Sequence, residues 1–538
     1  MEKMKKVFAI LLVFVVVFTV VACNGTTTDT NTNNGDTATD NGGASTDSGG
    51  STDSNVSAKD TLTVAFTQDR GTLDPMYMLG YDSLNAMRNI YETLWDFDRA
   101  GNMVWMLATG LEFIEPTVWH ISIREGITFA DGSTFNADDA LFSILRGNKR
   151  VGEPPYLPEL DMENSKVLDE YTVELIFNSY DLSYVAGMAS LFMIDVESFD
   201  EDTMATTPNG TGPYVLTDYV INSHIDFKAR DGYWGEAPKI PNLHFIVLAE
   251  DAQRVNALQT GTADISRVPF QDIEFVQTLP GVTVEITNAA QGMSKALYMN
   301  TSEHSVFYDN VDARQAVAMA IDRQAIVDIA YSGFADVSRL PLSMGNVDVE
   351  ERFCDMGVYG TGYDPEGAKA LAESAGLMDK DILLINNGSA SDVVMCELVQ
   401  ANLREIGVTC TVQSLDPGSW LSYAFDPTAY DMCIDFTSAP SATLAQGYYA
   451  WATYHVGGSY LTSPWPGNER YKELIDGIMA VSDPTEISNR YMELTEIHTN
   501  AMLWFTLVDM KTADAYNSDL KGWAPYLMGN VNYSQLSW

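Results

Sequence analysis

The chain has 538 residues, more than one compact core accommodates, so we expect two or three domains. Hydrophobic residues make up 46% and aromatic residues 11%, which is the composition of a folded globular protein and excludes a wholly disordered chain. With 30 Lys and Arg against 74 Asp and Glu, the net charge is -44, which argues against nucleic acid or anionic lipid headgroups as partners.

The first segment has the pattern of an export signal. Lysines precede an apolar run at 7–21 that is short for a membrane span and typical of a secretory signal peptide. The run ends in Val20-Val21-Ala22-Cys23, which resembles a bacterial lipobox, in which the Cys is lipidated and becomes the new N-terminus. We therefore predict a signal peptide at 1–22 and a lipid on Cys23. The alternative is an ordinary Ala-x-Ala-type cleavage site with an incidental Cys.

Residues 23–58 are predicted to be a disordered linker. After Cys23, nearly every residue to Ser57 is Gly, Ser, Thr, Asn or Asp, so there is almost no apolar surface to offset the entropy of ordering. A coil of this length reaches roughly 30 Å. Such a linker would let an anchored domain move to meet a partner on the same membrane. No later segment is apolar for long enough to span a bilayer.

The folded part is expected to begin at Lys59. β-Branched content and alternation predict strands at 61–66, 118–123, 172–177 and 243–248. Helical spacing of apolar residues predicts helices at 82–96, 137–146 and 251–260.

The second half alternates helices and strands more regularly. Helices are predicted at 312–320 with Asp312 as N-cap, at 322–331, from Asp364-Pro365 to Gly376, at 392–406, and from Asp483-Pro484 onward. Strands are predicted at 382–385 and 408–412. This alternation indicates an α/β fold with a largely covered sheet.

No catalytic motif is present. The chain lacks a Gly-x-Ser-x-Gly elbow and a His-Glu-x-x-His pair. Gly210-Thr211-Gly212 is followed by Pro213, which removes an N–H that a phosphate loop would use, so we interpret it as a tight turn. We predict no enzyme activity, no cofactor and no metal site; an extracellular hydrolase is the less favoured alternative. The histidines are scattered without metal-ligand spacing: His120, His224, His244, His304, His455 and His498.

Four cysteines remain after Cys23: Cys354, Cys396, Cys410 and Cys433. None forms a Cys-x-x-Cys pair, so a zinc or redox site is not indicated. Disulfides in any of three connectivities and free buried thiols both stay open.

A series of motifs follows one order along the chain. They include Leu73-Asp74-Pro75, Asn89-Ile90-Tyr91-Glu92, Asp131-Gly132, Gly210-Thr211-Gly212-Pro213-Tyr214, Asp231-Gly232-Tyr233-Trp234, Asp312-Ala313-Arg314-Gln315-Ala316, Asp322-Arg323 and Tyr363-Asp364-Pro365. In this order they resemble the bacterial extracellular solute-binding proteins of family 5, the receptors of peptide and nickel importers. The resemblance covers nearly everything after residue 59. Most of these motifs are interpreted as structural, with Arg314 and Asp322 holding helices in place.

The resemblance implies an α/β, two-lobed clamshell like that of periplasmic binding proteins, with an extra subdomain in the first lobe. The first lobe is expected at 59–295, with the subdomain at about 88–205, and the second lobe at 296–507. Residues 508–538 are expected to return to the first lobe. The two passages between lobes are placed near 296–300 and 503–508.

The resemblance also implies function. We expect a substrate-binding lipoprotein of an ABC importer, anchored in the cell membrane through its lipid alone and facing outside, that captures a peptide-like solute and delivers it to the permease subunits. The alternatives are a non-peptide solute (a nickel chelate, an oligosaccharide, an opine or haem) and a peptide-signal receptor. We expect a monomer.

The implied ligand site centres on Cys433-Ile434-Asp435-Phe436. This stretch resembles one in peptide-binding members whose acidic residue pairs with the ligand's α-amino group, whereas Met432 stands where those members usually carry Trp. The alternative is that Asp435 caps a local turn.

Further candidates lie on both lobes. Trp420 and Trp451 are candidate pocket walls within an aromatic-rich region, or ordinary core residues. In the family, the strand end that corresponds to Arg70 and Gly71 runs beside the ligand. Arg70 would meet a ligand carboxylate there, or would pair with neighbouring acids on the surface.

Overall fold

The structure is a computed structural model. It describes residues 59–77, 80–98, 102–149, 156–157, 159–179, 183–287, 293–346, 348–424, 426–437, 444, 447–448, 469–478, 481, 483–526 and 530–538. The predicted signal peptide and linker, with Cys23, and the aromatic candidate Trp451 lie outside these residues. Among the described residues, no helix has the length and apolar character needed to cross a bilayer.

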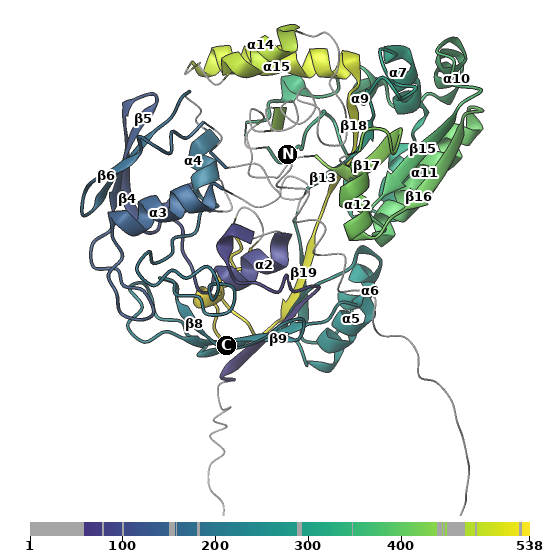
Figure 1. Ribbon diagram of the computed structural model, residues 1–538. Helices are drawn as coiled ribbons and strands as arrows, with labels where there is room; N and C mark the ends of the chain where they lie inside the picture. Colours follow the sequence, from purple (N-terminus) through teal and green to yellow (C-terminus); the bar gives the residue numbers. More distant parts are fainter. Residues whose placement is uncertain are drawn as a thin grey trace, which may run out of the picture. The chain divides into compact units, whose positions relative to one another are not determined.

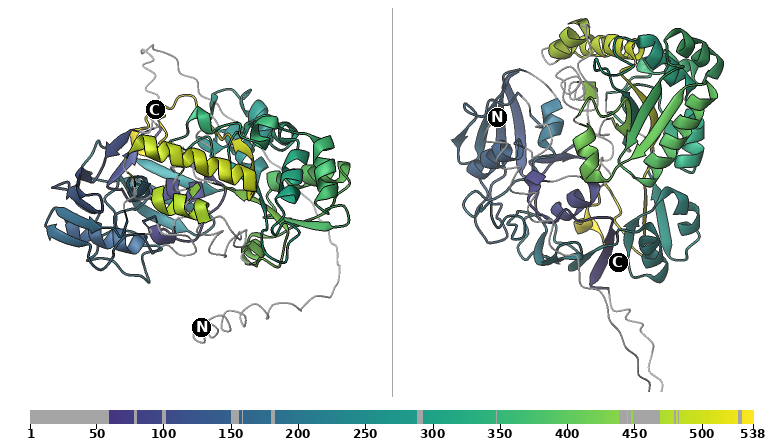
Figure 2. Two further views of the ribbon diagram at one scale, coloured as in Figure 1. Left: turned by 90° about the horizontal axis from the view of Figure 1, so that it is seen from above. Right: turned by 45° about the vertical axis from the view of Figure 1, so that its right-hand side comes forward.

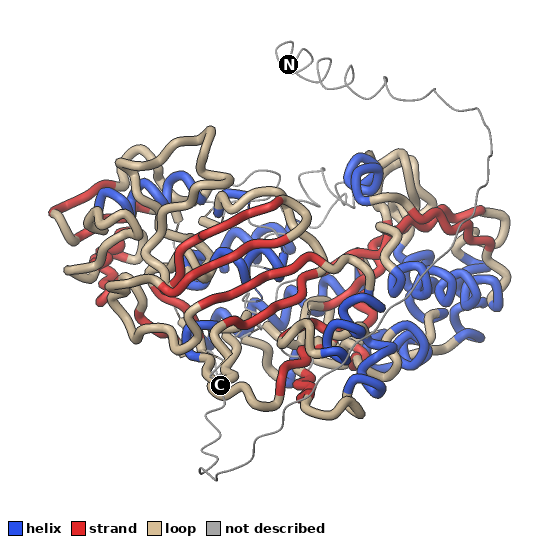
Figure 3. The backbone as a smooth tube through the Cα atoms, turned by 90° about the horizontal axis from the view of Figure 1, so that it is seen from below, coloured by secondary structure: helices blue, strands red, loops and turns tan. Residues whose placement is uncertain are grey.

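A seven-stranded sheet is built from segments far apart in sequence. Figure 3 shows strands lying side by side in a sheet. Its order is β12 (Val282–Ile286), β19 (Ala513–Asn517), β11 (Ile265–Arg267), β1 (Thr61–Phe66), β10 (Asn242–Val247), β9 (His224–Ala229) and β8 (Tyr214–Val220). β1 pairs in parallel with β10 and β11, and the other pairs are antiparallel. Helices α2 (Gly80–Met87), α5 (Asp251–Thr260) and α6 (Ile273–Val276) accompany it, with short 3-10 helices at Pro75–Tyr77, Phe270–Asp272 and Tyr533–Gln535.

A second sheet of four strands has a core of its own. Its order is β4 (Ala108–Glu115), β5 (Val118–Ile123), β7 (Thr172–Ile176) and β6 (Lys166–Asp169), and β2 (Trp95–Phe97) pairs separately with β3 (Met103–Trp105). Helices α3 (Ala137–Gly147) and α4 (Ser183–Met188) belong to the same region. Trp119 and Ile121 of β5 pack with Ala140 and Ile144 of α3 in one buried cluster. The four-stranded sheet and α3 therefore share one hydrophobic core.

A six-stranded sheet carries hydrophobic cores on both faces. Its order is β14 (Ala335–Val337), β18 (Trp504–Met510), β13 (Ser294–Met299), β17 (Met432–Phe436), β15 (Asp381–Asn386) and β16 (Thr409–Ser414). Leu297 and Ile434 belong to one buried cluster, whereas Ala296 and Cys433 belong to another, because successive side chains point to opposite faces of a strand. This is the covered sheet that the alternating sequence pattern predicts.

Helices supply the packing on this six-stranded sheet. They are α7 (Val311–Ala320), α8 (Arg323–Ala330), α9 (Val358–Thr361), α10 (Pro365–Ser374), α11 (Ala390–Glu405), α12 (Pro417–Ala424), α14 (Glu469–Ile478) and α15 (Pro484–Ala501), with a 3-10 helix at Glu351–Phe353. Helix α11 packs on β15 and β16 (Figure 1), and α14 lies along α15 (Figure 2).

The chain passes between the seven- and six-stranded sheets twice, after β12 and again between β18 and β19. The passages meet at Thr287 and Thr512: the Thr287 N–H donates to the Thr512 carbonyl at 2.8 Å, and the Thr512 N–H donates to Thr287 Oγ1 at 2.9 Å. The segments 296–300 and 503–508, where the sequence places these passages, lie largely in strands β13 and β18.

The predicted helix at 82–96 is wrong in its second half. Helix α2 ends at Met87, and the following residues bond to another segment: Gly212 N–H donates to the Ile90 carbonyl at 2.8 Å and Tyr214 N–H to the Asn89 carbonyl at 2.9 Å. A Cβ on Gly210 would stand 2.1 Å from the Ile90 carbonyl oxygen. The glycines at 210–212 therefore permit a close approach of two backbones rather than a tight turn.

Helix starts are predicted better than helix lengths. Asp483 is an N-cap, as predicted, and Asp322 and Asp364, where helices are predicted to begin, are N-caps as well; each accepts a backbone N–H from the first turn. Asp312 is not a cap: Asn310 caps α7, and its side chain accepts the Ala313 N–H at 3.2 Å.

All four cysteines of the folded part are free thiols and buried. This resolves the alternative that the sequence leaves open. Burial raises the pKa of the Cys410 thiol to about 12, so this cysteine stays protonated and unreactive in the folded protein.

Candidate functional site

Asp435 lies near the end of β17, on the sheet face that also carries Cys433. It stands opposite Ala296 of the neighbouring strand and is 8% exposed. Burial raises the pKa of the Cys433 thiol, and the negative charge of Asp435, two residues along the same strand face, raises it further. A carboxylate so little exposed to water favours a cationic partner over an apolar or anionic one.

Phe436, the next residue, points to the opposite face. Its ring lies under the Lys295 ammonium, with 3.7 Å between Nζ and the ring centroid. Lys295 Nζ also forms a 2.8 Å ion pair with Asp392 Oδ2 at the start of α11, and both side chains are almost fully buried. The Phe436 carbonyl accepts the Tyr298 hydroxyl at 2.7 Å, which fixes the end of β17 against β13.

The other second-lobe candidates divide between the two faces. Trp420 of α12 packs in the same buried cluster as Cys433, on the face of Asp435. Met432 is fully buried in the cluster on the other face, with Leu297 and Ile434. Asp435 and Trp420 are thus on one face of the sheet, and Met432 and Phe436 on the other.

The first-lobe candidates follow β1 in the seven-stranded sheet, separate from the strand of Asp435. Arg70 is exposed and forms no ion pair among the described residues. Its neighbour Asp69 accepts hydrogen bonds from Gly71 N–H at 2.9 Å, Tyr219 OH at 2.8 Å and Asn222 N–H at 2.8 Å. Gly71 has φ of +72°, which glycine adopts without strain. Asp69 and Gly71 therefore hold the loop in place, and the Arg70 side chain is exposed.

In several sequence motifs, the polar side chains form hydrogen bonds with other residues of the protein. Asp74 accepts two hydrogen bonds from Arg146, at 2.8 and 2.6 Å. Glu92 accepts the Tyr233 hydroxyl at 2.6 Å and Trp234 Nε1–H at 2.7 Å. These contacts explain the motif residues as supports of the fold, which agrees with their structural interpretation.

Arg314 is a support of the same kind, in helix α7 beside the six-stranded sheet. It is fully buried and donates to the carbonyls of Ala501 at 2.8 Å and Phe307 at 2.6 Å, which ties α7 to the end of α15.

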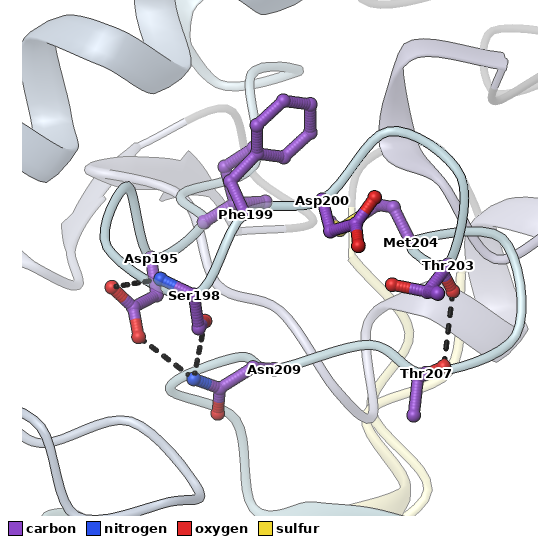
Figure 4. Close-up of a pocket in the computed structure, with 9 residues that line it drawn as sticks. Asp195, Ser198, Phe199, Asp200, Thr203, Met204, Thr207 and Asn209 are labelled. Atoms are coloured by element: carbon purple, nitrogen blue, oxygen red, sulfur yellow. Dashed lines mark hydrogen bonds between the residues drawn. The ribbon is translucent and has the colours of Figure 1, made fainter.

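A small pocket in the first lobe is closed by its own hydrogen bonds (Figure 4). Asn209 Nδ2–H donates to Asp195 Oδ2 at 2.9 Å and to Ser198 Oγ at 3.1 Å across it. Its volume of about 10 Å³ holds about one water molecule, so it is no site for a peptide or a comparable solute.

The buried pair Lys295–Asp392 is the main feature that the sequence analysis missed. Lys295 sits inside the apolar run of β13 and Asp392 in the first turn of α11, and both look like ordinary surface residues in sequence. The one available signal is the charged residue inside an otherwise apolar strand, because a lysine is seldom fully buried unless it is paired.

Comparisons with known proteins agree with this architecture. Residues 102–459 match the model of the bacterial extracellular solute-binding proteins, family 5 (middle region). The chain is 23% identical over 508 residues to the glutathione-binding protein GsiB of Salmonella typhimurium, covering 89% of this chain and 94% of that protein. It is 25% identical over 469 residues to the dipeptide-binding protein of Escherichia coli, covering 77% and 82%.

A solved structure shares the fold at low identity. The ABC transporter substrate-binding protein CtaP of Listeria monocytogenes superposes with a TM-score of 0.75 at 19% identity, covering 89% of this chain and 99% of CtaP.

The chain belongs to the bacterial extracellular solute-binding proteins of family 5, since the family model matches more than half of it. It is a substrate-binding protein of the ABC-transporter class that works outside the cytoplasm, and it is not an enzyme. These findings confirm the predicted family, the α/β periplasmic-binding-protein fold and the expectation of binding without catalysis.

Proposed function

We propose that this protein binds peptide-like solutes between its two lobes, holds their α-amino group on Asp435, and delivers them to the permease subunits of an ABC importer. The lobes are those predicted from sequence, 59–295 with 508–538, and 296–507. The observation that carries the proposal is the placement of Asp435: a nearly buried carboxylate near the end of β17, within the stretch that resembles the amine-binding stretch of peptide receptors. The names of two relatives, a dipeptide-binding and a glutathione-binding protein, favour a ligand of this kind.

Charge complementarity supports the same role. A ligand ammonium would give Asp435 charge-assisted hydrogen bonds in a site from which solvent is excluded. Arg70, on the other sheet, would meet the ligand carboxylate.

Replacing the carboxylate tests this role. Truncating one partner of a buried charge pair costs roughly 2–5 kcal/mol, because the other charge is left desolvated. Asp435→Asn keeps the shape and should weaken binding of a short peptide at least about tenfold in titration calorimetry. The matched control is Asp379→Asn at an exposed position, which should bind as the wild type does.

Acetylation of the peptide provides the complementary test. An N-acetylated peptide should bind the wild type poorly and should lose little more on Asp435→Asn, because its charge is already absent. If Asp435→Asn binds the unmodified peptide as tightly as the wild type, Asp435 is a turn residue and the amine is held elsewhere.

The alternatives concern the solute rather than the fold. The same architecture would also suit a non-peptide solute: a nickel chelate, an oligosaccharide, an opine or haem. Alternatively, the protein would bind a peptide as a signal receptor and not for import. Mass spectrometry of small molecules released on denaturing the purified protein separates these cases. Recovery of a non-peptide solute alone would replace the peptide in the proposal.

The proposed attachment to the membrane depends on Cys23. We propose that it carries the lipid, and that residues 24–58 form the flexible linker between lipid and folded domain. Cys23→Ala should release the protein into the medium or leave it unprocessed, which fractionation and lipid labelling measure. Retention and labelling like those of the wild type would show that the chain is held in another way.

A further inference from the structure

Two histidines and two aspartates gather on one face of the seven-stranded sheet, in the neighbouring strands β8, β9 and β10. Asp218 stands opposite Asp226, which stands opposite His244, so three strands each contribute one residue to a single row. His224 precedes Asp226 by two residues and therefore shares its face. Leu243 and Phe245 point to the other face, into the core.

The distances between these side chains are those of a shared site. His224 Nε2 lies 3.1 Å from Asp218 Oδ2 and 4.0 Å from Asp226 Oδ2. One ligand atom each from Asp218, His224 and Asp226 all lie within 4.8 Å of one another. Ligands at about 2.0–2.2 Å from a tetrahedral Zn²⁺ are roughly 3.3–3.6 Å apart, so an ion fits after small side-chain adjustments.

The surrounding contacts are those that orient metal ligands. His244 Nδ1 lies 2.5 Å from Asp226 Oδ1, which leaves Oδ2 of the same carboxylate turned to His224. The other ring nitrogen of His224, Nδ1, is 3.0 Å from Ser223 Oγ. A ligating histidine whose second nitrogen is hydrogen-bonded, and a ligating carboxylate held through its second oxygen, are the usual outer contacts of a metal site.

Charge also favours a cation here. Within the described part of the chain, neither Asp218 nor Asp226 forms an ion pair with a Lys or Arg, and the histidines are their partners. Lys228 lies two residues beyond Asp226 on the same face without pairing to it. The side chain of Asp218 is 60% exposed, so an ion can enter from solvent and keep a water ligand.

We propose that Asp218, His224 and Asp226, with His244 positioning Asp226, bind a divalent transition-metal ion of the Zn²⁺ type. Imidazole nitrogen together with carboxylate oxygen is a donor set that Zn²⁺ accepts. The ion joins the edge strand β8 to β9, in a different sheet from Asp435. The sequence analysis expected no metal site, because antiparallel register rather than sequence spacing brings these residues together.

The test uses full-length protein without a polyhistidine tag, stripped with a chelator and titrated with ZnCl₂ in a calorimeter. The wild type should bind one Zn²⁺ per chain at a site that His224→Ala and Asp218→Asn each abolish. His244→Ala should weaken binding roughly 10- to 100-fold, as expected for a residue that orients a ligand. The matched control is His120→Ala, because His120 also pairs with a carboxylate, Glu174, but outside this cluster.

A second measurement separates a built site from weak association with surface carboxylates. Zn²⁺ should raise the thermal unfolding midpoint of the wild type and of His120→Ala, but not of His224→Ala, because an ion stabilises only the folded state that binds it. Absence of binding in the wild type, or equal binding and equal midpoint shifts in wild type and His224→Ala, would overturn the proposal.

Discussion

Lys295 and Asp392 form a buried ion pair, and removing one partner tests how much an unpaired buried charge lowers the free energy of unfolding. Their side chains are 3% and 0% exposed, and the pair spans β13 and α11 at 2.8 Å. Lys295→Met leaves the Asp392 carboxylate buried without its cation, which should lower the free energy of unfolding by roughly 3–5 kcal/mol in urea denaturation. The double variant Lys295→Met/Asp392→Leu should recover most of this loss, since no buried charge remains.

An exposed pair provides the control for that measurement. Lys166 pairs with Glu174 at 2.9 Å, but the lysine side chain is 60% exposed. Lys166→Met should therefore change the stability little, because an ion pair in water contributes little. A double variant no more stable than Lys295→Met would mean that shape, rather than charge, determines the loss.

Asp509 makes stability depend on pH. Burial raises the pKa of this carboxyl to about 6, against hydrogen bonds from Ser294 Oγ and Met344 N–H that favour the charged form. Because its pKa in the folded protein lies above the unfolded value, folding favours the neutral acid. The stabilisation is complete below pH 4 and is lost as the pH rises through 6, a change of about 3 kcal/mol for two pKa units.

Asp509→Asn removes this titration. Relative to the wild type, the variant should therefore gain stability as the pH rises from 4 to 8, whereas Asp379→Asn at the surface should keep a constant difference. Urea denaturation at pH 4, 6 and 8 measures both. A difference between Asp509→Asn and wild type that does not change with pH would mean that Asp509 is ionised throughout.

At the scale of elements, Gly210 permits the close approach of two backbone segments, because it has no side chain where it meets Ile90. An alanine Cβ at Gly210 would stand 2.1 Å from the Ile90 carbonyl oxygen, and moving that backbone disturbs the hydrogen bonds that end α2. Gly210→Ala should lower stability by roughly 1–3 kcal/mol, as overpacking does. Gly110→Ala is the control, because its Cβ would meet Ser122 at an ordinary 3.7 Å. Equal thermal midpoints for the two variants would contradict this role of Gly210.

The same example shows which elements a sequence predicts. Helix starts such as those at Asp322 and Asp483 are local, since the carboxylate accepts an N–H two or three residues away, and the sequence predicts both starts correctly. The sequence does not predict the end of α2 correctly, because that end depends on Gly210 and Gly212, more than 100 residues later. Apolar spacing continues past Met87 for reasons of tertiary packing, and spacing alone does not reveal where the helix stops.

Prediction of the candidate site from sequence is limited in the same way, because the site depends on contacts between distant segments. The Cys433–Phe436 stretch could be found by resemblance, but the faces on which its side chains lie follow from strand pairing. Met432 and Asp435 are three residues apart and point to opposite faces, so Met432 packs with Leu297 and Ile434 while Asp435 lies on the face of Cys433 and Trp420. The cluster of His224, Asp226 and His244 depends on pairing between strands in the same way, and scattered histidines in sequence concealed it.

For the whole molecule, the central expectation is closure of two lobes on a solute. The chain passes between the seven- and six-stranded sheets at two adjacent points, which Thr287 and Thr512 join through hydrogen bonds. Two short adjacent passages restrict relative motion to bending about them, as in hinge proteins. A ligand that contacts both lobes then shifts an open–closed equilibrium by the difference between its affinities for the two states.

Small-angle scattering tests this closure. Once calorimetry has established saturation with a bound peptide, the radius of gyration should be smaller than in the free protein, and any contribution of the linker is common to both samples. Asp435→Asn, measured at a peptide concentration that fills the wild type but not the variant, should keep the larger radius. This comparison attributes the change to occupancy and not to the added peptide. Identical profiles for free and saturated wild type would show that this protein binds its solute without closing, and that the paired passages at Thr287 and Thr512 are rigid.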